Sequence, residues 1–392
     1  MACDGARADR RVAELAGGCR SVRLRVLVVM PLGNALGGGE QMLRQLLRSS
    51  DPAAVAWDVV FLRDGPLVEE MRAQATVHVI DAGRFRDIGR RAAAVRRIAA
   101  LVRASGADLV FGWMVAGQAT AGPAALLAGA PNAWYQVGTP RPDWLDRFAT
   151  LWPTRGVIAL SRDGVEAQSR IWPSRPVRLV YPGVSLDAID GVRTQSPDAV
   201  RGRLGLPTDR PLVGLVGRLQ RWKGVHVFLD AIAAARRSVP TLHGVVVGGP
   251  HETEPGYADE LRAQAERLEL TDAVTFAGFQ SNSIEWMQAM DVVVHASDHE
   301  PFGIVVVEAM ALGKPVVAGA GGGPAEIITD GTDGRLVPFG DSAGIAVAVA
   351  RLLGDKAGAR AMGEAARRRA ANFAEPAYAA AVVAAMQAFA RG

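Results

Sequence analysis

Cysteine is almost absent from this sequence. Its two cysteines, Cys3 and Cys19, precede the first apolar run, so the chain that follows can form no disulfide and no thiolate metal site. This usage is typical of a reducing compartment, and we expect a cytoplasmic protein. No apolar run is long enough to cross a bilayer, and residues 1–21 lack the apolar stretch of a secretory signal. We expect residues 1–21 to be a disordered tail.

Lysine is also scarce, and charge of either sign is nearly balanced. The formal net charge is +4, from 44 basic and 40 acidic residues, and only Lys223, Lys314 and Lys356 are lysines. Such an excess, carried by arginine, fits a solvated surface encoded by a GC-rich genome, so we expect no nucleic-acid partner. The 392 residues are 49% hydrophobic and 21% charged, which excludes a disordered chain and allows two or three domains.

Short apolar runs alternate with amphipathic stretches in the first half of the chain. The runs predict strands at 25–30, 57–62, 77–80, 108–112 and 156–160. The amphipathic stretches predict helices at 40–49, 66–75, 87–104, 117–128 and 162–171. Continuous apolar strands separated by helices indicate a parallel sheet that is covered on both faces.

The pattern pauses after residue 181 and then resumes. Residues 181–207 are rich in proline and glycine and lack an apolar period, which predicts a linker at 191–207. A second series follows, with strands predicted at 211–217, 242–249, 273–278, 291–297 and 314–319, and helices at 222–237, 257–269 and 304–312. The predicted domains are therefore 22–190 and 208–374, with a last helix at 375–392. Two doubly wound α/β domains would place the carboxyl ends of both sheets at one cleft, where ligands bind.

The segment GRLQRWKG, residues 217–224, lies where a predicted strand ends and a helix begins. Gly217 permits a tight turn, and Arg218 and Lys223 can both reach the mouth of the cleft. Two cations beside a helix N-terminus suit a diphosphate and would stabilise a leaving group that gains charge. The alternative is a solvated basic turn. The rarity of lysine in this chain favours the functional interpretation.

The segment SDHEPFGIVVVEAMALGKPVV, residues 297–317, places two carboxylates around the start of another predicted helix. Glu300 would lie on the preceding loop and Glu308 inside the helix. The free N–H groups of a helix start can bind sugar hydroxyls or phosphate oxygens, and an ionised carboxylate can accept from the two hydroxyls of a ribose. The alternative is that Glu308 serves only the helix dipole. A carboxylate inside so apolar a run is costly without a partner, which favours binding.

These two motifs resemble those of family 4 glycosyltransferases of the GT-B fold. The supporting matches are GGGE (37–40), VIALS (157–161), YPGVSLD (181–187), AGAGGGPAEII (318–328) and DGRLVPFGD (333–341). The resemblance runs from Val22 to the end of the chain and is specific in the second half. It implies two Rossmann-like, doubly wound domains that face a cleft, and a C-terminal helix that crosses back to the first domain. The activity that it implies is sugar transfer from a nucleotide sugar with retention of anomeric configuration.

The resemblance also implies roles for single residues. Three of them would be catalytic: Arg218 and Lys223 would hold the donor diphosphate, and Glu300 would hold the donor sugar. The implied donor-binding set is Gly38, Gly39, Phe279, Phe302, Gly303, Ile304 and Glu308. In this set Glu308 would hold the ribose, the backbone near Phe279 would meet the base, the amides at 302–304 would hold the sugar, and the loop 37–39 would close over the phosphates. The nucleotide sugar is a co-substrate; because the sequence has no Asp-x-Asp motif, we expect no metal and no further cofactor.

The chain departs from the family at one position. Many members have a histidine at the end of the strand that precedes the acceptor loop. Here the segment PNAWYQVGTP, residues 131–140, offers Val137, or Gln136 after a one-residue shift, and neither is a base. A side-chain contact from this position to the sugar or acceptor is therefore in doubt.

The acceptor is assigned to the N-terminal half. In TPRPDWLDRF, residues 139–148, Trp144 offers a stacking face and Asp143 can bind amines or hydroxyls. The alternative is an ordinary capped helix start with Trp144 in the core. The basic stretch 84–103 is predicted to be a plain surface helix, although in some relatives such a surface touches anionic membrane. Membrane contact is thus possible but not favoured, and the oligomeric state is left open.

The sequence therefore predicts a hexosyl or aminohexosyl transferase. The expected donor is UDP-linked, and the expected acceptor is a small hydroxylated molecule such as an aminocyclitol or other natural-product core, as in antibiotic biosynthesis. A cell-envelope or lipid-linked glycan is the alternative acceptor. Two other classes remain open: a sugar-nucleotide 2-epimerase of the same fold and a non-catalytic nucleotide-sugar-binding subunit. Donor turnover that requires an acceptor would distinguish the first class from both of these.

Overall fold

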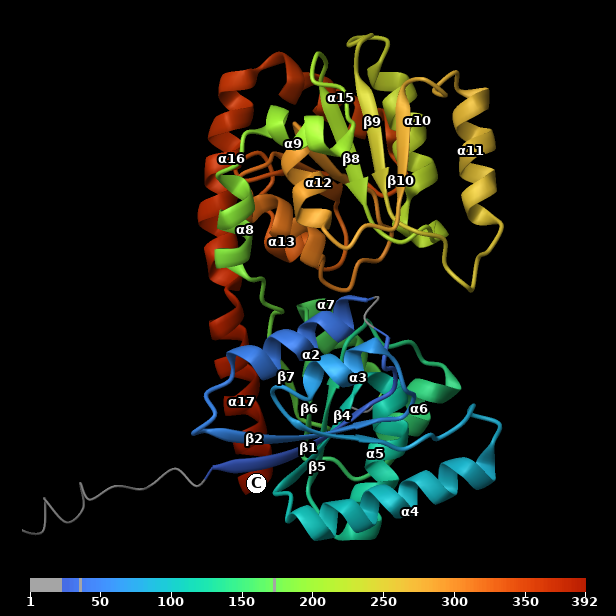
Figure 1. The fold of residues 1–392 in the computed structure, drawn as a ribbon, viewed down its shortest axis with the longest axis vertical. Coiled ribbons are helices and arrows are strands. Elements are labelled where there is room, and N and C mark those ends of the chain that lie inside the picture. The colour runs from blue at the N-terminus through green and yellow to red at the C-terminus, as the bar shows by residue number, and fades with distance from the viewer. Residues whose placement is uncertain (1–22, 35–36, 172–173) are drawn as a thin grey trace, which may run out of the picture.

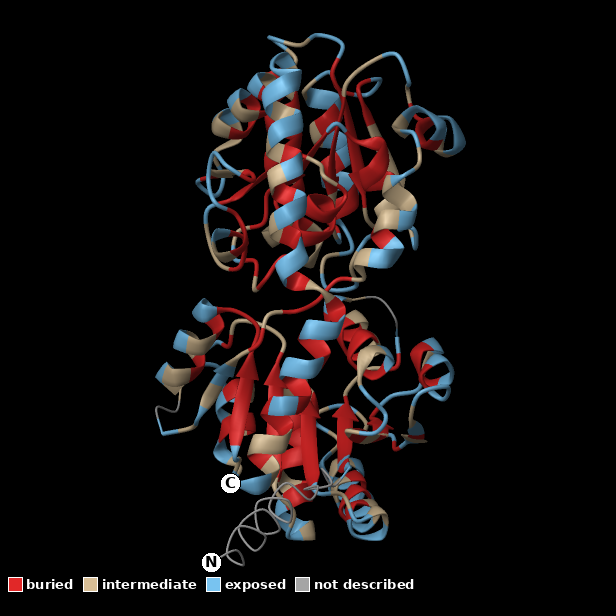
Figure 2. Ribbon diagram, turned by 90° about the vertical axis from the view of Figure 1, so that its left-hand side faces the viewer, coloured by how far each residue is buried: buried red, intermediate tan, exposed pale blue. Residues whose placement is uncertain are grey.

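The computed structural model describes residues 23–34, 37–171 and 174–392, and it consists of two parallel α/β domains stacked along the long axis (Figure 1). The predicted disordered tail and both cysteines lie outside the described residues. Figure 2 shows that the strands of both sheets are buried, whereas the helices expose their outer faces. Within the described ranges, no helix combines the length and the apolar character needed to span a bilayer.

The N-terminal domain is built on a seven-stranded parallel sheet of order β3-β2-β1-β4-β5-β6-β7. Its strands are β1 (Leu24–Met30), β2 (Val55–Phe61), β3 (Thr76–Val79), β4 (Leu109–Trp113), β5 (Asn132–Gln136), β6 (Gly156–Ala159) and β7 (Val177–Leu179). Its helices are α2 (Gly38–Ser49), α3 (Pro66–Met71), α4 (Ile88–Ser105), α5 (Met114–Ala128), α6 (Trp144–Leu151) and α7 (Arg162–Ile171). The central strands are apolar on both sides because helices cover both faces of the sheet.

The C-terminal domain has a six-stranded parallel sheet of order β10-β9-β8-β11-β12-β13. Its strands are β8 (Leu212–Val216), β9 (His243–Val247), β10 (Val274–Gly278), β11 (Val292–His295), β12 (Val316–Gly319) and β13 (Arg335–Val337). Its helices are α10 (Val225–Ala235), α11 (Tyr257–Arg267), α12 (Ser283–Ala289), α13 (Ile304–Ala311), α14 (Pro324–Ile327), α15 (Ser342–Gly354) and α16 (Lys356–Ala370). A 3-10 turn, η1 (Arg221–Lys223), precedes α10.

The strand order reverses once in each sheet, between β1 and β4 and between β8 and β11. At such switch points the connections leave in opposite directions, so the carboxyl ends of the strands border a crevice. The two switch points face each other. Gln41, at the start of α2, donates from Nε2 to Glu308 Oε1 of α13 at 3.3 Å, and a Cβ added to Gly38 would lie 3.3 Å from Ile304 Cδ1. The two predicted doubly wound domains are confirmed.

The range 191–207, predicted as a linker, is mostly helical. It contains the end of α8 (Leu186–Arg193) and all of α9 (Pro197–Leu204). Arg201 of α9 is buried, with Nη2 2.9 Å from Asp291 Oδ2 and Nε donating to the Ala289 carbonyl at 2.8 Å. Thus α9 packs against α12 and belongs to the C-terminal domain. Helix α9 was not predicted from the sequence because it has only eight residues, begins at a proline and contains a glycine.

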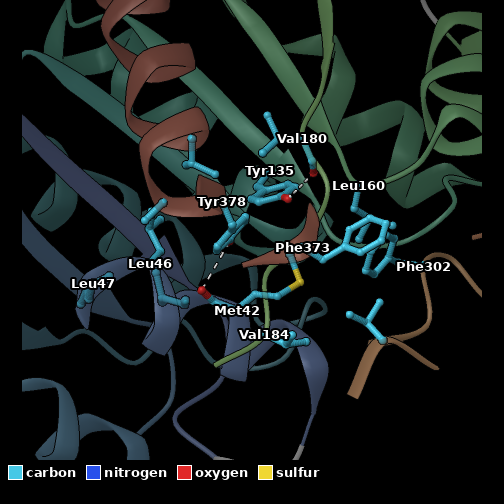
Figure 3. Close-up of a cluster of buried hydrophobic side chains, with 14 of the residues drawn as sticks. Met42, Leu46, Leu47, Tyr135, Leu160, Val180, Val184, Phe302, Phe373 and Tyr378 are labelled. Atoms are coloured by element: carbon cyan, nitrogen blue, oxygen red, sulfur yellow. Dashed lines mark hydrogen bonds between the residues drawn. The ribbon is translucent and has the colours of Figure 1, made fainter. Parts of the chain in front are cut away.

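The last helix, α17 (Glu375–Arg391), returns along the N-terminal domain, as predicted (Figure 1). The Tyr378 hydroxyl donates to the Met42 carbonyl of α2 at 3.3 Å, and Figure 3 shows Tyr378 beside Tyr135 of β5. At its first residue, the buried Glu375 carboxylate accepts from Arg48 Nε at 3.0 Å and from Ser49 Oγ at 2.6 Å. These contacts fix the end of the C-terminal domain to the N-terminal domain.

We expect Gly156→Ala to loosen this attachment. A Cβ at Gly156 of β6 would lie 2.1 Å from Cε1 of Phe389, a buried residue of α17. Overpacking of this kind costs about 1–3 kcal/mol, so the urea unfolding midpoint should fall. Gly202→Ala is the matched control, since open space surrounds this glycine of α9; there alanine should stabilise by about 0.5–1 kcal/mol. An unchanged midpoint in Gly156→Ala would contradict the close packing of α17.

Candidate active site

The carboxyl edge of the C-terminal sheet is built by glycines that allow backbone segments to touch. A Cβ on Gly248 would lie 1.8 Å from the Gly217 carbonyl oxygen, so the turns after β9 and β8 pack backbone to backbone. Gly224 has a φ of +68°, and a Cβ there would lie 2.0 Å from the Ala296 carbonyl oxygen. The turn η1 therefore lies directly on the segment that follows β11, where Asp298 N donates to the Trp222 carbonyl at 2.8 Å.

This packing brings Lys223 against Glu300. Lys223 Nζ lies 2.6 Å from Glu300 Oε2, and the two side chains are only 15% and 11% exposed. His295, at the end of β11, places Nε2 3.1 Å from the same oxygen. Burial by itself would raise the pKa of the Glu300 carboxyl, but the charge of Lys223 and the hydrogen bond with His295 hold it well below its usual range. The site therefore contains a fixed, buried ion pair at neutral pH.

The helix α13 begins directly beside this pair. Gly303 has a φ of +105°, which lets the chain reverse between Glu300 and the helix. The N–H groups that open α13 have no acceptor within the helix and are therefore available to a ligand. The Phe302 ring points away from this edge. It lies in the cluster of Figure 3, with ring centroids 5.8 Å from Tyr181 and 5.6 Å from Phe373, so only the backbone of Phe302 can serve a ligand.

Glu308 lies one turn into α13 and is buried, with its carboxylate toward the N-terminal domain. Burial raises the pKa of the Glu308 carboxyl to about 7, and the hydrogen bond from Gln41 opposes the shift without cancelling it. A buried carboxylate with so weak a partner is poised to accept stronger hydrogen bonds from a ligand. The vicinal hydroxyls of a ribose have the required donors.

The glycine-rich segment 37–39 of the N-terminal domain lies opposite, and it forms the N-cap and first turn of α2 where a loop was predicted. Gly37 caps α2, and a Cβ on it would lie 2.5 Å from Glu40 Oε2, so this carboxylate folds back over the loop. Burial raises the pKa of Glu40, while the nearby charges of Arg218 and Arg44 lower it. Arg218 therefore lies near the loop of the other domain. The expected donor residues on both domains are thus brought together across the interface.

Two further residues at this edge were missed by the sequence reasoning. His295 supports Glu300, and His251 places Nε2 3.4 Å from Arg218 Nη1. His295 ends β11 and His251 follows β9, so both lie in the C-terminal domain, far in sequence from the strand where the family histidine was expected. Phe279 follows β10 and is 61% exposed; it lies beside Gly249, where an added Cβ would be 3.1 Å from Phe279 Cβ. Its backbone is thus placed at the outer end of the same edge.

Val137, which stands where many family members have a histidine, packs against the glycine-rich segment 37–39. A Cβ on Gly39 would meet Val137 Cγ1 at 3.0 Å and Met114 Cε at 2.1 Å, so two apolar side chains cover the glycine loop here. Gln136, the other candidate, is buried and donates from Nε2 to Asp146 Oδ1 at 2.8 Å. Neither side chain is a proton acceptor for a reacting group.

The expected acceptor residues lie at the start of α6, and among the described residues no hydrogen bond, ion pair or ring contact joins them to the donor residues. Asp143 is the N-cap of α6: its Oδ1 accepts from Leu145 N and from Asp146 N, both at 2.9 Å. Asp143 therefore caps a helix, as the alternative interpretation predicted. That interpretation also placed Trp144 in the core, and this part is wrong. Trp144 is 64% exposed, contacts Phe85 edge-on at 5.4 Å, and lines a pocket of about 640 Å³ between α6 and α7.

Comparison with known proteins finds a family match in the C-terminal half of the chain. Residues 197–369 match the family model described as glycosyl transferases group 1. D-inositol 3-phosphate glycosyltransferase of Mycolicibacterium smegmatis is 39% identical over 163 residues, which is 41% of this chain and 36% of that protein. The Mycobacterium leprae enzyme of the same name is 41% identical over 202 residues, 50% of this chain and 45% of that protein. The chain thus spans less than half the length of these curated relatives.

Solved structures are similar over nearly the whole chain. Anabaena HepE in complex with UDP and glucose superposes with a TM-score of 0.81 at 24% identity, covering 93% of this chain and 99% of that one. Sucrose-phosphate synthase from Thermosynechococcus elongatus gives a TM-score of 0.80 at 23% identity, covering 93% and 98%. The fold is therefore GT-B, and residues 197–369 form a domain of the glycosyl transferase group 1 family. The resemblance found in the sequence is confirmed for the fold and for this domain, which contains Arg218, Lys223, Glu300 and Glu308.

Proposed function

We propose that the chain is a retaining glycosyltransferase that moves a hexosyl or aminohexosyl group from a UDP-linked sugar to a small hydroxylated acceptor. The observation that carries this proposal is the buried Lys223–Glu300 pair beside the start of α13, facing the glycine loop of the other domain. A diphosphate at this edge would meet the Lys223 ammonium and the Arg218 guanidinium. The sugar would meet Glu300 and the N–H groups of Gly303 and Ile304. The ribose would replace Gln41 as the partner of Glu308.

The reaction in this site is a displacement at the anomeric carbon of the donor sugar. The bond from that carbon to the diphosphate oxygen breaks, and the diphosphate leaves with the electron pair. The acceptor oxygen forms the new bond on the same face, and its proton passes to the departing diphosphate oxygen. Lys223 and Arg218 stabilise the charge that grows on the leaving group, so catalysis rests on positioning and electrostatic stabilisation. We propose that this chemistry needs no metal, and EDTA is then expected to leave turnover unchanged.

The choice of UDP is supported by HepE, whose complexes contain UDP, UDP-glucose or UDP with glucose. The choice of acceptor comes from the N-terminal domain. Trp144 is exposed and lines the α6–α7 pocket, which suits stacking against a sugar or cyclitol ring, as in an aminocyclitol core of antibiotic biosynthesis. The relatives named for inositol phosphate cover 41% and 50% of this chain, so the cyclitol is proposed on the N-terminal pocket and not on their names. A cytoplasmic location, where nucleotide sugars are available, is part of this proposal.

A lipid-linked or cell-envelope glycan is the second candidate acceptor. The α6–α7 pocket favours it, because Phe148, Leu151 and Ile171 make its lining apolar while Arg147 and Arg170 also border it. Such a pocket suits a chain that is apolar along its length and anionic at its head. Transfer to a detergent-dispersed polyprenyl phosphate glycan, with none to soluble cyclitols, would favour this candidate.

Thermal shift with UDP, GDP, ADP and dTDP is the first test. A ligand that binds the native state raises the melting temperature, and we expect UDP to raise it most. UDP release from UDP-hexoses is then measured with and without a panel of cyclitols and aminocyclitols, and the anomer of the product is read by NMR. Release that depends on acceptor, with retained configuration, is expected. Isomerised donor without acceptor would indicate the epimerase, and nucleotide binding without turnover would indicate the non-catalytic subunit.

A further inference from the structure

A second large crevice lies on the C-terminal domain. It has a volume of about 1170 Å³, and its lining includes residues that immediately precede three strands: Pro211 before β8, Asp291 before β11 and Pro315 before β12. These are the amino ends of strands whose carboxyl ends carry the candidate active site. The crevice therefore lies at the opposite ends of the strands from the candidate active site, and its lining includes residues of α8, α9, α15 and α16, all labelled in Figure 1.

The crevice is strongly basic. Eight of its lining residues are arginine or lysine and four are aspartate or glutamate, an excess of 8 − 4 = +4. This excess equals the formal net charge of the whole chain. Two of the three lysines in the sequence, Lys314 and Lys356, lie here, and the third is Lys223 of the candidate active site. Most cations of this chain are arginines, so the crevice differs from the rest of the surface in its lysine content.

Several of these cations are not neutralised within the protein. Lys314 Nζ donates to a neutral group, the Gln288 carbonyl, at 2.7 Å. Asp190 serves two arginines, with Oδ1 2.7 Å from Arg193 Nε and 3.8 Å from Arg367 Nη2. Among the described residues, the side chains of Lys356 and Arg368 have no hydrogen-bond or ion-pair partner. The other lining cations pair with the four acidic residues of the crevice, and the cations left without an acidic partner repel one another until an anion enters.

We propose that this crevice binds a small molecule that carries several phosphate groups, at a site separate from the candidate active site. Guanidinium groups bind phosphate oxygens in pairs and ammonium groups act as point charges, so the mixture present here matches phosphate chemistry. The crevice volume of about 1170 Å³ is far larger than a single phosphate needs. It is large enough for a ligand of the size of a nucleotide. The cations surround a hollow instead of following a track, which favours a small anion over a polymer. Burial lowers the pKa of Lys314 to about 8, and a bound anion would restore its full charge.

The test uses inorganic tripolyphosphate as the probe, titrated into the full chain by calorimetry at constant ionic strength. The crevice variant is Lys356→Gln with Arg368→Gln, two exposed side chains whose removal leaves no acidic group unpaired. The control is Arg96→Gln with Arg97→Gln on α4, which removes the same charge from an exposed helix of the other domain. We expect the crevice variant to weaken binding by at least about tenfold and the control to leave it unchanged.

Two more measurements separate this site from the donor site. Lys223→Ala should keep tripolyphosphate binding, and the crevice variant should keep the thermal shift with UDP, so either proposal can fail without the other. Three outcomes would overturn the inference: no binding by the wild type, equal loss in both double variants, or loss in Lys223→Ala alone. Adsorption to phosphatidylglycerol vesicles without binding of tripolyphosphate would also overturn it, in favour of a membrane surface.

Discussion

Lys223→Ala is expected to reduce kcat by about a hundredfold to a thousandfold, the range found when one donor to a developing negative charge is removed. The affinity for UDP should fall much less. The charge on the leaving diphosphate grows as its bond to the sugar breaks, so the ammonium of Lys223 stabilises the transition state more than the bound donor. The measurement is kcat together with the dissociation constant of UDP. Equal losses in both would contradict a role in leaving-group stabilisation.

The same substitution also affects folding, and a second variant separates the two effects. Without Lys223 the buried Glu300 keeps only His295 as a partner, and breaking a buried ion pair costs about 3–5 kcal/mol. Lys223→Met with Glu300→Met removes both charges and should recover much of the lost stability without recovering kcat. Recovery of turnover would show that Lys223 acts only through the structure.

The sign of the pH dependence provides an independent check on this pair. The pKa of Glu300 in the folded protein is held below its ordinary value of 4.5. Its contribution to stability is therefore fully present above pH 4.5 and is lost as the pH falls below that value. The double variant Lys223→Met with Glu300→Met lacks the pair. As the pH falls below 4.5, the wild type should therefore lose more stability than the double variant.

The fold was largely readable from the sequence because most strands are continuous apolar runs. Strands such as β1 and β9 have few polar residues, and the helices between them fall near the predicted ranges. The elements that escaped prediction are short or mixed in character. β7 has three residues with an arginine in the middle, and α9 and α12 have eight and seven residues. The packing of α9 depends on partners far away in the chain, such as Asp291 for Arg201.

The candidate site was predictable where chemistry is local in sequence. Lys223 and Glu300 stand in compact motifs, and their pairing follows from the adjacency of β8 and β11. The contacts across the two domains were not predictable, because nothing in the sequence indicates that Gln41 reaches Glu308 or that Arg218 lies near Glu40. The acceptor side was least predictable. There Asp143 caps a helix, and the next residue, Trp144, borders a pocket.

Glu308→Gln is expected to weaken binding of a nucleotide sugar by about 1–3 kcal/mol, the cost of losing a hydrogen bond to a charged group. The amide keeps the shape of the carboxylate, but it cannot accept from both ribose hydroxyls through charged oxygens. UDP-glucose is the suitable probe because its diphosphate has no ionisation near neutrality. Binding is measured by calorimetry from pH 6 to 8 (about one unit on each side of the Glu308 pKa).

The pH profile decides what Glu308 does. In the free wild type its pKa is raised from 4.5 to about 7, so ionisation costs stability: the stability is highest below pH 4.5 and falls as the pH rises through about 7. Ribose hydroxyls favour the ionised form, so donor affinity should rise with pH over the same window in the wild type and stay flat in Glu308→Gln. The variant should also be the more stable protein at pH 8, because it buries no charge. A carboxylate whose ionisation lowers the stability of the free protein but raises its affinity for a ligand is a binding group. If Glu308→Gln were instead less stable at pH 8 and bound UDP-glucose normally, Glu308 would be a structural residue that only supports α13.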